Sequence, residues 1–299
     1  MATAADRCLL RFVPQIRPKR PSVGARTTAM FEQLRTEALA EGIELIRFAY
    51  AGSIEKGTGL RRYRDRECSI PGQAVDLVVE IAPGESPTHE IYLQLEELAG
   101  YCFDAAGQAD ELDFRRDRLR WRLLPILAQR GPDGYGQWLV SPGRADRTSV
   151  RTHTRDVRER TRASIEQHPS VGFNDCVRLL KWWLATRPAE VELPSFVVER
   201  LAIAAYDQLG VHDGFAATLA AWAERLAELD ARGLVDPAGE GRPLLAGWSE
   251  HDRDALARWF ADGAGALREA RASSDPRTIA ERLGEQMFGP ALVRAIDER

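Results

Sequence analysis

The sequence has few of the residue patterns that mark redox, zinc or membrane proteins. Its four cysteines are widely spaced and form no CxxC pair, and its five histidines form no HExxH motif. We therefore expect reduced, structural thiols and no zinc site. No apolar run is long enough to cross a bilayer, and the arginine-interrupted run at Cys8–Val13 does not have the pattern of a signal peptide. These absences predict a cytoplasmic protein without membrane association.

An excess of positive charge is also absent. The formal net charge is −4 and the isoelectric point is about 5.9. Strong nucleic-acid binding by the whole molecule is not expected, so any site for a polyanion must be local, and a small substrate is favoured. With 299 residues, 44% of them hydrophobic and 29% charged, the chain has enough apolar material for one large domain or two lobes.

The stretch Ala51–Ile81 has the most informative pattern. The run Leu45–Ala51 has the length and apolar character of a strand, and Gly52 with Ser53 then predicts a tight turn whose N–H groups and hydroxyl face an anion. The run Val75–Ile81 predicts a second strand, buried on both faces. It carries Asp76, and a carboxylate in such a strand must be ion-paired, hydrogen-bonded or bound to a metal.

The remaining elements follow from helical and strand periodicity. Residues 1–26, with RPKRP, predict an extended N-terminal arm, and Thr27–Glu41 predicts a helix capped by Thr27 or Thr28 and ended by Gly42. The charged run Arg61–Glu67 is interpreted as a solvated loop or as a basic lip for phosphate. Further helices are predicted at Thr88–Ala106, Arg151–Arg162, Phe173–Leu184, from Pro194 and Ser195 onward, at Phe215–Arg232 and at Ser249–Ala270, with a proline-containing strand at Leu119–Leu127.

Several motifs together resemble a known family. They are Gly52-Ser53, the KGT of Lys56–Thr58, the strand with Asp76, and a helix with Lys181 followed by LPSF. This combination resembles the DNA polymerase β-like nucleotidyltransferases and, within them, the cGAS/DncV-like (CD-NTase) family. The resemblance implies an α+β fold: a nucleotidyltransferase core lobe at 27–150, a helical lobe at 151–299, and a nucleotide cleft between them.

The resemblance also implies a chemistry. In the family, three carboxylates hold two Mg²⁺ or Mn²⁺ ions, two from positions i and i+2 of one strand and the third from the neighbouring strand. In this sequence the matching positions hold Ala74, Asp76 and Arg122, so only one acid remains. The residues implied to bind nucleotide are Gly52, Ser53, Lys56, Lys181, Ser195 and Arg122, and Asp76 is the only implied catalytic or metal-binding residue.

Other acids are candidates to replace the missing ones. Glu80 shares a strand face with Asp76, but four residues along a strand is about 13 Å, too far for a shared metal pair. Asp65 and Glu67 are in a loop, and Asp113 or Asp117 is relevant only if the strand register differs. Because a guanidinium pairs with a carboxylate or a phosphate, we hypothesise that Arg122 takes the place of a metal cation.

Two functional hypotheses remain, both within antiphage (CBASS-type) nucleotide signalling as the resemblance implies. The replacements at Ala74 and Arg122 favour a pseudoenzyme that binds a nucleotide or acts as a scaffold, together with a protein partner from the same defence system. The alternative is an active, metal-dependent nucleotidyltransferase that makes a cyclic di- or oligonucleotide messenger from NTPs. A tRNA-modifying or antibiotic nucleotidyltransferase is a third class, which the LPSF helix disfavours.

Overall fold

The structure is a computed structural model. The described residues are 2–18, 23–64, 69–70, 72, 74–108, 111–116, 119–128, 137–138, 151–187, 193–229, 234–235, 243–245 and 247–297. The chain divides into two compact units. The helical unit is Met1–Pro18, Lys56–Gly72 and Thr148–Arg299, and the sheet unit is Lys19–Glu55 and Gln73–Arg147. The predicted mixed α+β composition is confirmed.

The sheet unit is built on one mixed sheet with the strand order β1-β4-β7-β6-β5, to which β8 adds by pairing with β7. The strands are β1 (Leu45–Tyr50), β4 (Val75–Ile81), β5 (Ala106–Gln108), β6 (Glu111–Arg116), β7 (Leu119–Leu127) and β8 (Gln137–Trp138). Strands β4 and β7 are parallel, whereas the other pairs are antiparallel. The predicted strands at Val75–Ile81 and Leu119–Leu127 are therefore present and adjacent.

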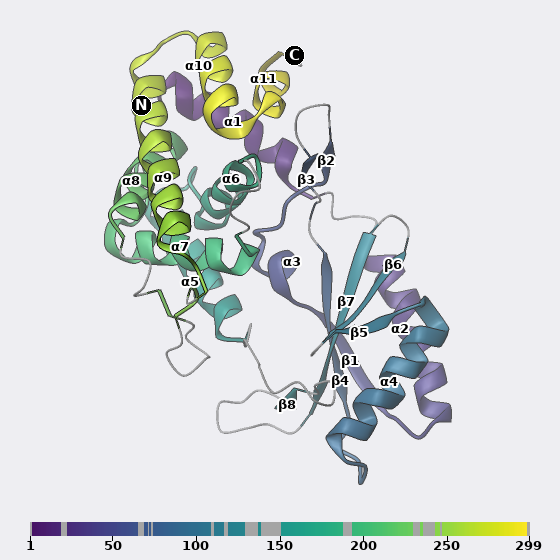
Figure 1. Ribbon diagram of the computed structural model, residues 1–299. Helices are drawn as coiled ribbons and strands as arrows, with labels where there is room; N and C mark the ends of the chain where they lie inside the picture. The colour runs from purple at the N-terminus through teal and green to yellow at the C-terminus, as the bar shows by residue number, and fades with distance from the viewer. Residues whose placement is uncertain are drawn as a thin grey trace. The chain divides into compact units, whose positions relative to one another are not determined.

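The two faces of this sheet have different roles. Leu77 and Val79 of β4 belong to a buried core that also contains residues of helices α2 (Val23–Ala40) and α4 (Thr88–Phe103). Figure 1 shows both helices against the same side of the sheet. Because side chains alternate along a strand, Asp76 and Glu80 point to the opposite face. That face carries the candidate site.

Helix α2 begins earlier than predicted. Thr27 and Thr28 lie inside the helix instead of capping it. The Thr28 hydroxyl donates to the Gly24 carbonyl at 3.2 Å, and the Thr27 hydroxyl is 2.9 Å from the Tyr50 hydroxyl. A threonine hydroxyl can donate a hydrogen bond to a backbone carbonyl in the preceding turn of a helix, so a threonine does not by itself mark where a helix begins. The predicted end is confirmed at Gly42, which has φ of 76°.

Pro125 lies in β7 at the point where the neighbouring strand changes from β6 to β8. On the edge away from β4, strand β6 pairs with β7 up to Leu123, and β8 begins pairing at Ile126. Because proline has no N–H to donate, it is tolerated where no ladder bond is needed on one side. The strand therefore continues through the proline to Leu127.

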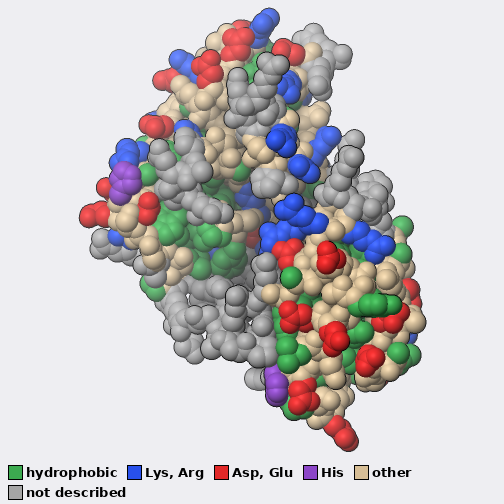
Figure 2. Space-filling view, turned by 45° about the vertical axis from the view of Figure 1, so that its right-hand side comes forward, with side chains coloured by type: hydrophobic (Ala, Val, Ile, Leu, Met, Phe, Trp, Pro, Cys, Tyr) green, Lys and Arg blue, Asp and Glu red, His purple; other side chains and the backbone are tan. Residues whose placement is uncertain are grey.

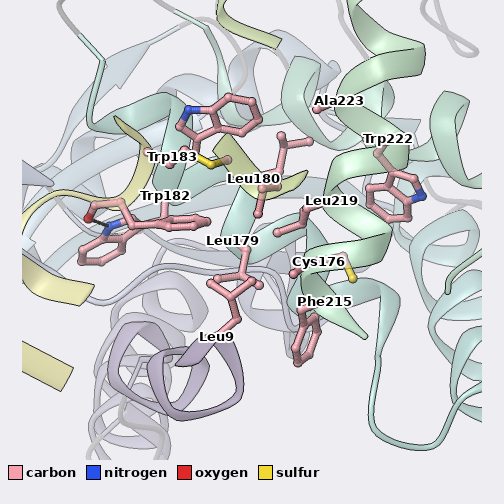
Figure 3. Packing of buried hydrophobic residues seen from close by; sticks show 14 of the residues in the cluster. Leu9, Cys176, Leu179, Leu180, Trp182, Trp183, Phe215, Leu219, Trp222 and Ala223 are labelled. Atoms are coloured by element: carbon pink, nitrogen blue, oxygen red, sulfur yellow. Dashed lines mark hydrogen bonds between the residues drawn. The ribbon is translucent and has the colours of Figure 1, made fainter. Parts of the chain in front are cut away.

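The helical unit consists mainly of packed helices. They are α1 (Ala4–Ile16), α5 (Arg151–Gln167), α6 (Phe173–Ala185), α7 (Ser195–Leu209), α8 (Phe215–Ala227), α9 (Glu250–Ala272), α10 (Pro276–Leu283), the π-helix η2 (Gly284–Phe288) and α11 (Pro290–Asp297). A small hairpin of β2 (Tyr63–Arg64) and β3 (Ser69–Ile70) belongs to the same unit. Figure 3 shows Leu9 of α1, Leu179 of α6 and Phe215 of α8 in the shared core.

The prediction of an extended arm at residues 1–26 is wrong for most of the described residues of that range, whereas residues 1 and 19–22 lie outside the described part of the chain. Residues 4–16 form helix α1, whose start is fixed by a capping box between Thr3 and Asp6. Its apolar residues recur at helical spacing and are buried in the core of the helical unit. Pro14 is tolerated near the end of the helix, where the run of apolar residues still continues to Ile16. Burial of this apolar side outweighs the cost of the proline.

The outward side of α4 mixes acidic and apolar side chains, as the lower right of Figure 2 shows. Leu93 and Tyr101 are exposed there, whereas Tyr92 and Leu95 are buried.

Among the described residues, no helix is both long and apolar enough to cross a membrane.

The cysteines provide a first test of the packing. Cys8 and Cys176 are buried, and burial raises the pKa of each thiol, that of Cys176 well above 9.0. Since the thiolate is the reactive form, we expect neither residue to react with iodoacetamide in the native protein at neutral pH. Both are expected to react fully after denaturation, as peptide mass spectrometry would show. Rapid native labelling of Cys176 would contradict the described packing of α6.

Candidate functional site

The candidate site begins where β1 ends and the short helix α3 (Gly52–Lys56) starts. Gly52 has φ of 57°, a conformation that favours glycine, and a Cβ at this position would lie 1.7 Å from Oδ2 of Asp76. The Ala51 N–H donates to the Asp76 carbonyl at 2.8 Å. The predicted Gly-Ser turn therefore lies directly against the carboxylate of β4, with Ser53 in the first turn of α3.

Asp76 is buried and paired with Arg122. The two residues are directly opposite in the parallel pairing of β4 and β7. Nε of Arg122 donates to Oδ1 of Asp76 at 2.6 Å, and the Arg122 Nη2 is 2.5 Å from the same oxygen. The side chain of Asp76 is 7% exposed and that of Arg122 is 32% exposed. The arginine therefore supplies a positive charge at the carboxylate, which is a basis for the hypothesis that it takes the place of a metal.

Two further acids on this face of the sheet, Asp113 and Glu80, are held by arginines of neighbouring strands. Asp113 lies opposite Arg122 on β6 and accepts a hydrogen bond from Nε of Arg120 at 2.6 Å. Glu80 is ion-paired with Arg47 of β1. Neither carboxylate lies in a cluster with Asp76. For Glu80 this agrees with the prediction that it is too far from Asp76 along the strand to share a metal pair. Asp65, Glu67 and Asp117 lie outside the described residues.

These residues do not fit a two-metal centre. Position 74 is alanine, Asp76 contacts a guanidinium, and Asp113 is bonded to Arg120. Within the described part of the chain, no group of three or more His, Cys, Asp or Glu side chains is arranged to hold a metal ion. A guanidinium cannot ligate Mg²⁺, and each Mg²⁺ requires oxygen ligands.

In the helical unit, the loop that follows α3 is fastened by a buried charge cluster. Glu199 of α7 accepts hydrogen bonds from Lys56 at 2.5 Å, from Thr58 at 2.6 Å and from Lys181 at 2.5 Å. All four side chains are buried, and Glu199 is only 1% exposed. We call these four residues the Glu199 cluster.

Helix α6 holds the same loop through a second set of contacts. Nε of Arg178 donates to the Gly59 carbonyl at 2.9 Å, and its Nη2 bonds the Gly57 carbonyl. Arg178 is in turn paired with Asp175, which is also bonded to Arg17 at 2.5 Å. The KGT motif therefore has a structural role that the sequence did not reveal: its backbone and side chains anchor the loop to α6 and α7.

Two of the predicted nucleotide-binding residues thus lie in the Glu199 cluster. Burial lowers the pKa of the Lys181 ammonium, and the carboxylate of Glu199 acts in the opposite direction. Both Lys56 and Lys181 are bonded to Glu199, so a phosphate must compete with that carboxylate for them. Ser195 is different, because it is exposed in the first turn of α7, after Pro194. The predicted start of that helix is confirmed.

The helical unit also contains a cavity of about 530 Å³. Helix α8 contributes Ala217, Ala220 and Ala221 to its lining, and α9 contributes Arg268 and Arg271. None of the predicted nucleotide-binding residues lines it, so the cavity is separate from the predicted site.

The whole chain was compared with known proteins. It is similar to the CD-NTase CdnG of Bradyrhizobium diazoefficiens in complex with GTP, with a TM-score of 0.70, 16% identity and coverage of 98% of both chains. The chain has the fold of the CD-NTases. CdnC of E. coli MS115-1, in a complex with HORMA-deltaN, gives a TM-score of 0.69 at 20% identity over 96% of this chain and 97% of that chain.

A third similar structure is the GTP-bound form of Vibrio cholerae DncV. Its TM-score is 0.64 at 14% identity, with coverage of 89% of this chain and 73% of that chain. No protein-family model matches the chain, and no curated protein matches it in sequence. The similarity to the CD-NTase fold therefore lies in the structure, and it confirms the fold that the motifs predicted.

Proposed function

We propose that this protein is a nucleotide-binding component of cyclic-nucleotide signalling, of the type used in bacterial antiphage defence, and that it does not itself perform two-metal nucleotidyl transfer. The observation that carries the proposal is the ion pair of Arg122 with Asp76, formed in direct register between β4 and β7. The CD-NTase fold supports nucleotide binding, because similar structures are complexes with GTP or ATP.

The residues proposed to bind nucleotide are those that the family resemblance implies. Gly52 and Ser53 are proposed to contact phosphate, because a Gly-Ser turn can present N–H groups and a hydroxyl to an anion. Ser195 is exposed and is proposed to contribute a hydroxyl. Lys56 and Lys181 are proposed to contribute positive potential from the Glu199 cluster, which holds two ammonium groups and one carboxylate. A protein partner is proposed because CdnC forms a complex with HORMA-deltaN.

Turnover assays separate this proposal from an active synthase. With all four NTPs and either Mg²⁺ or Mn²⁺, we expect no pyrophosphate release above the level of a protein-free control. Calorimetry with the same NTPs is expected to show binding. Metal-dependent turnover by the unmodified chain would establish the alternative, a nucleotidyltransferase that makes a cyclic di- or oligonucleotide.

The variant Ala74→Asp/Arg122→Asp restores three carboxylates at the positions implied by the family. Since these acids repel one another without a cation, we expect the variant to be less thermostable than the parent in EDTA and to be stabilised by added Mg²⁺. The parent is expected to show no such Mg²⁺ effect. A thermal shift assay with both proteins measures the difference, and equal responses would count against the assignment of these positions.

A further inference from the structure

The face of the sheet that carries Asp76 also carries three arginines, whose places follow from the strand register. Arg122 of β7 is opposite Asp76 on one side and opposite Asp113 on the other. Two residues earlier in β7, Arg120 lies directly opposite Arg115 of β6 in the strand register. Because paired residues project from the same side of a sheet and side chains alternate along each strand, all three arginines share this face. We call Arg115, Arg120 and Arg122 the arginine row.

The arginine row lies beside the positions where the resembled family has acids. Val75 is paired with Trp121, so one further step of the register places Ala74 beside Arg120. Arg122 is beside Asp76. Neighbouring strands are about 4.8 Å apart, so Arg120 and Arg122 of β7 lie next to these two positions, and Arg115 of β6 is one strand further away, opposite Arg120. Ala74 carries no charge, and the carboxylate of Asp76 is neutralised by Arg122. These two positions therefore do not fit a pair of metal ions.

The charge of this face favours an anion. Among the described side chains of this face, Arg47 and the arginine row contribute four positive charges, whereas Asp76, Glu80 and Asp113 contribute three negative ones, which leaves a net charge of +1. Arg115 is exposed, and the side chain of Arg120 is 48% exposed, so guanidinium groups are accessible from solvent. Guanidinium groups bind phosphate oxygens through paired, charge-assisted hydrogen bonds and need no cation to do so.

We propose that the arginine row binds the polyphosphate of a nucleoside triphosphate directly, without a divalent cation. This inference rests on the proposed function, because it assigns the ligand's phosphates to the site that begins at Gly52. It adds a specific property: in a two-metal site the cations neutralise the triphosphate, whereas here the fixed arginines do so. A chelator therefore has no essential ion to remove.

Calorimetry of the intact protein with ATP and GTP tests this inference in EDTA and in millimolar Mg²⁺. We expect the affinity in EDTA to be equal to or higher than that in Mg²⁺, because Mg²⁺ neutralises part of the charge that the arginines recognise. Inorganic tripolyphosphate is expected to compete with the nucleotide, whereas adenosine is not. Arg115→Gln and Arg120→Gln are each expected to weaken binding at least about tenfold.

Arg116→Gln is the matched control. Arg116 is on the same strand as Arg115 but on the helix side of the sheet, where its guanidinium lies 5.9 Å from the ring centre of Phe103. This variant removes the same charge and is expected to bind nucleotide within about twofold of the parent, because its guanidinium is on the opposite face of the sheet from the row and only its screened charge acts there. Circular dichroism and thermal melts of each variant establish that it is folded.

The outcomes separate the two proposals. Binding that occurs only with Mg²⁺ overturns the direct contact and leaves nucleotide binding intact. Equal losses in Arg115→Gln and Arg116→Gln overturn the assignment to the arginine row, because they indicate a general charge effect. Absence of binding to every NTP and to tripolyphosphate, with and without Mg²⁺, overturns the proposed function and this inference with it.

Discussion

Replacement of Glu199 by glutamine is expected to lower the free energy of unfolding by about 3–5 kcal/mol, because it leaves two buried ammonium groups without their counter-ion. Glutamine preserves the shape and one acceptor for Thr58, so the change isolates the charge. Lys56 and Lys181 both contact the Glu199 carboxylate at 2.5 Å in the buried cluster. Urea denaturation followed by circular dichroism measures the loss.

The matched control is Glu224→Gln in the same unit. Glu224 pairs with Arg268 at 3.0 Å, but the two side chains are 46% and 62% exposed. An exposed pair contributes little, so this variant is expected to change the free energy of unfolding by no more than about 1 kcal/mol. Equal effects of the two substitutions would show that the Glu199 cluster is not the buried network described above.

The loss of unfolding free energy caused by Glu199→Gln is expected to depend on pH. Burial already lowers the pKa of Lys181 below its ordinary value of 10.5, and removal of Glu199 takes away the group that raises it. The unfolded chain then binds more protons than the folded one between the lowered folded pKa and 10.5, so stability rises with pH across that window. The difference between variant and parent is therefore expected to shrink from neutral pH towards pH 10.

Gly52→Ala is expected to lower the free energy of unfolding by about 2–5 kcal/mol. Alanine is strained at a φ of 57°, which costs about 1–2 kcal/mol. Its Cβ would also overlap Oδ2 of Asp76, and relief of such overpacking typically costs about 1–3 kcal/mol. Because the movement displaces Asp76 from Arg122, the variant is also expected to lose nucleotide binding.

A control with the same strain but no overlap is available in the same unit. Gly42 has φ of 76° and nothing within 4 Å of an added Cβ, so Gly42→Ala reports the backbone cost alone. The contact itself is tested by a double-mutant cycle, in which Gly52→Ala should cost less in an Asp76→Ala background than in the parent. Additive effects would mean that Gly52 and Asp76 do not constrain one another.

Local patterns were sufficient to predict much of the sheet. The apolar runs in Val75–Ile81 and Leu119–Leu127 predicted two strands, and their pairing places Arg122 beside Asp76, as the resemblance implied. Helix α1 was missed because proline and the basic segment that follows dominated the interpretation. The signal was present nevertheless, since Ala5, Cys8 and Phe12 have helical spacing after a Thr3-x-x-Asp6 capping box.

Contacts between distant segments were beyond sequence reasoning. Glu199 is separated from Lys56 by 143 residues, and nothing in the LPSF motif indicates that its helix delivers a carboxylate to the KGT loop. The lysines were therefore assigned to phosphate alone. A glutamate facing inward on an apolar helix was the available signal, since a buried acid requires a cationic partner. Which cation it would find depends on tertiary packing.

The packing of α1 has a consequence for how this protein is made. Its apolar side contacts α10 and α11, which are encoded at the other end of the described sequence. At a synthesis rate of about 5–20 residues per second, α1 leaves the ribosome roughly 10–60 s before those helices exist. During that interval α1 can pack against α6 and α8, but the part of its apolar side that contacts α10 and α11 has no native surface to cover it. The core of the helical unit is therefore completed only after α11 has been synthesised.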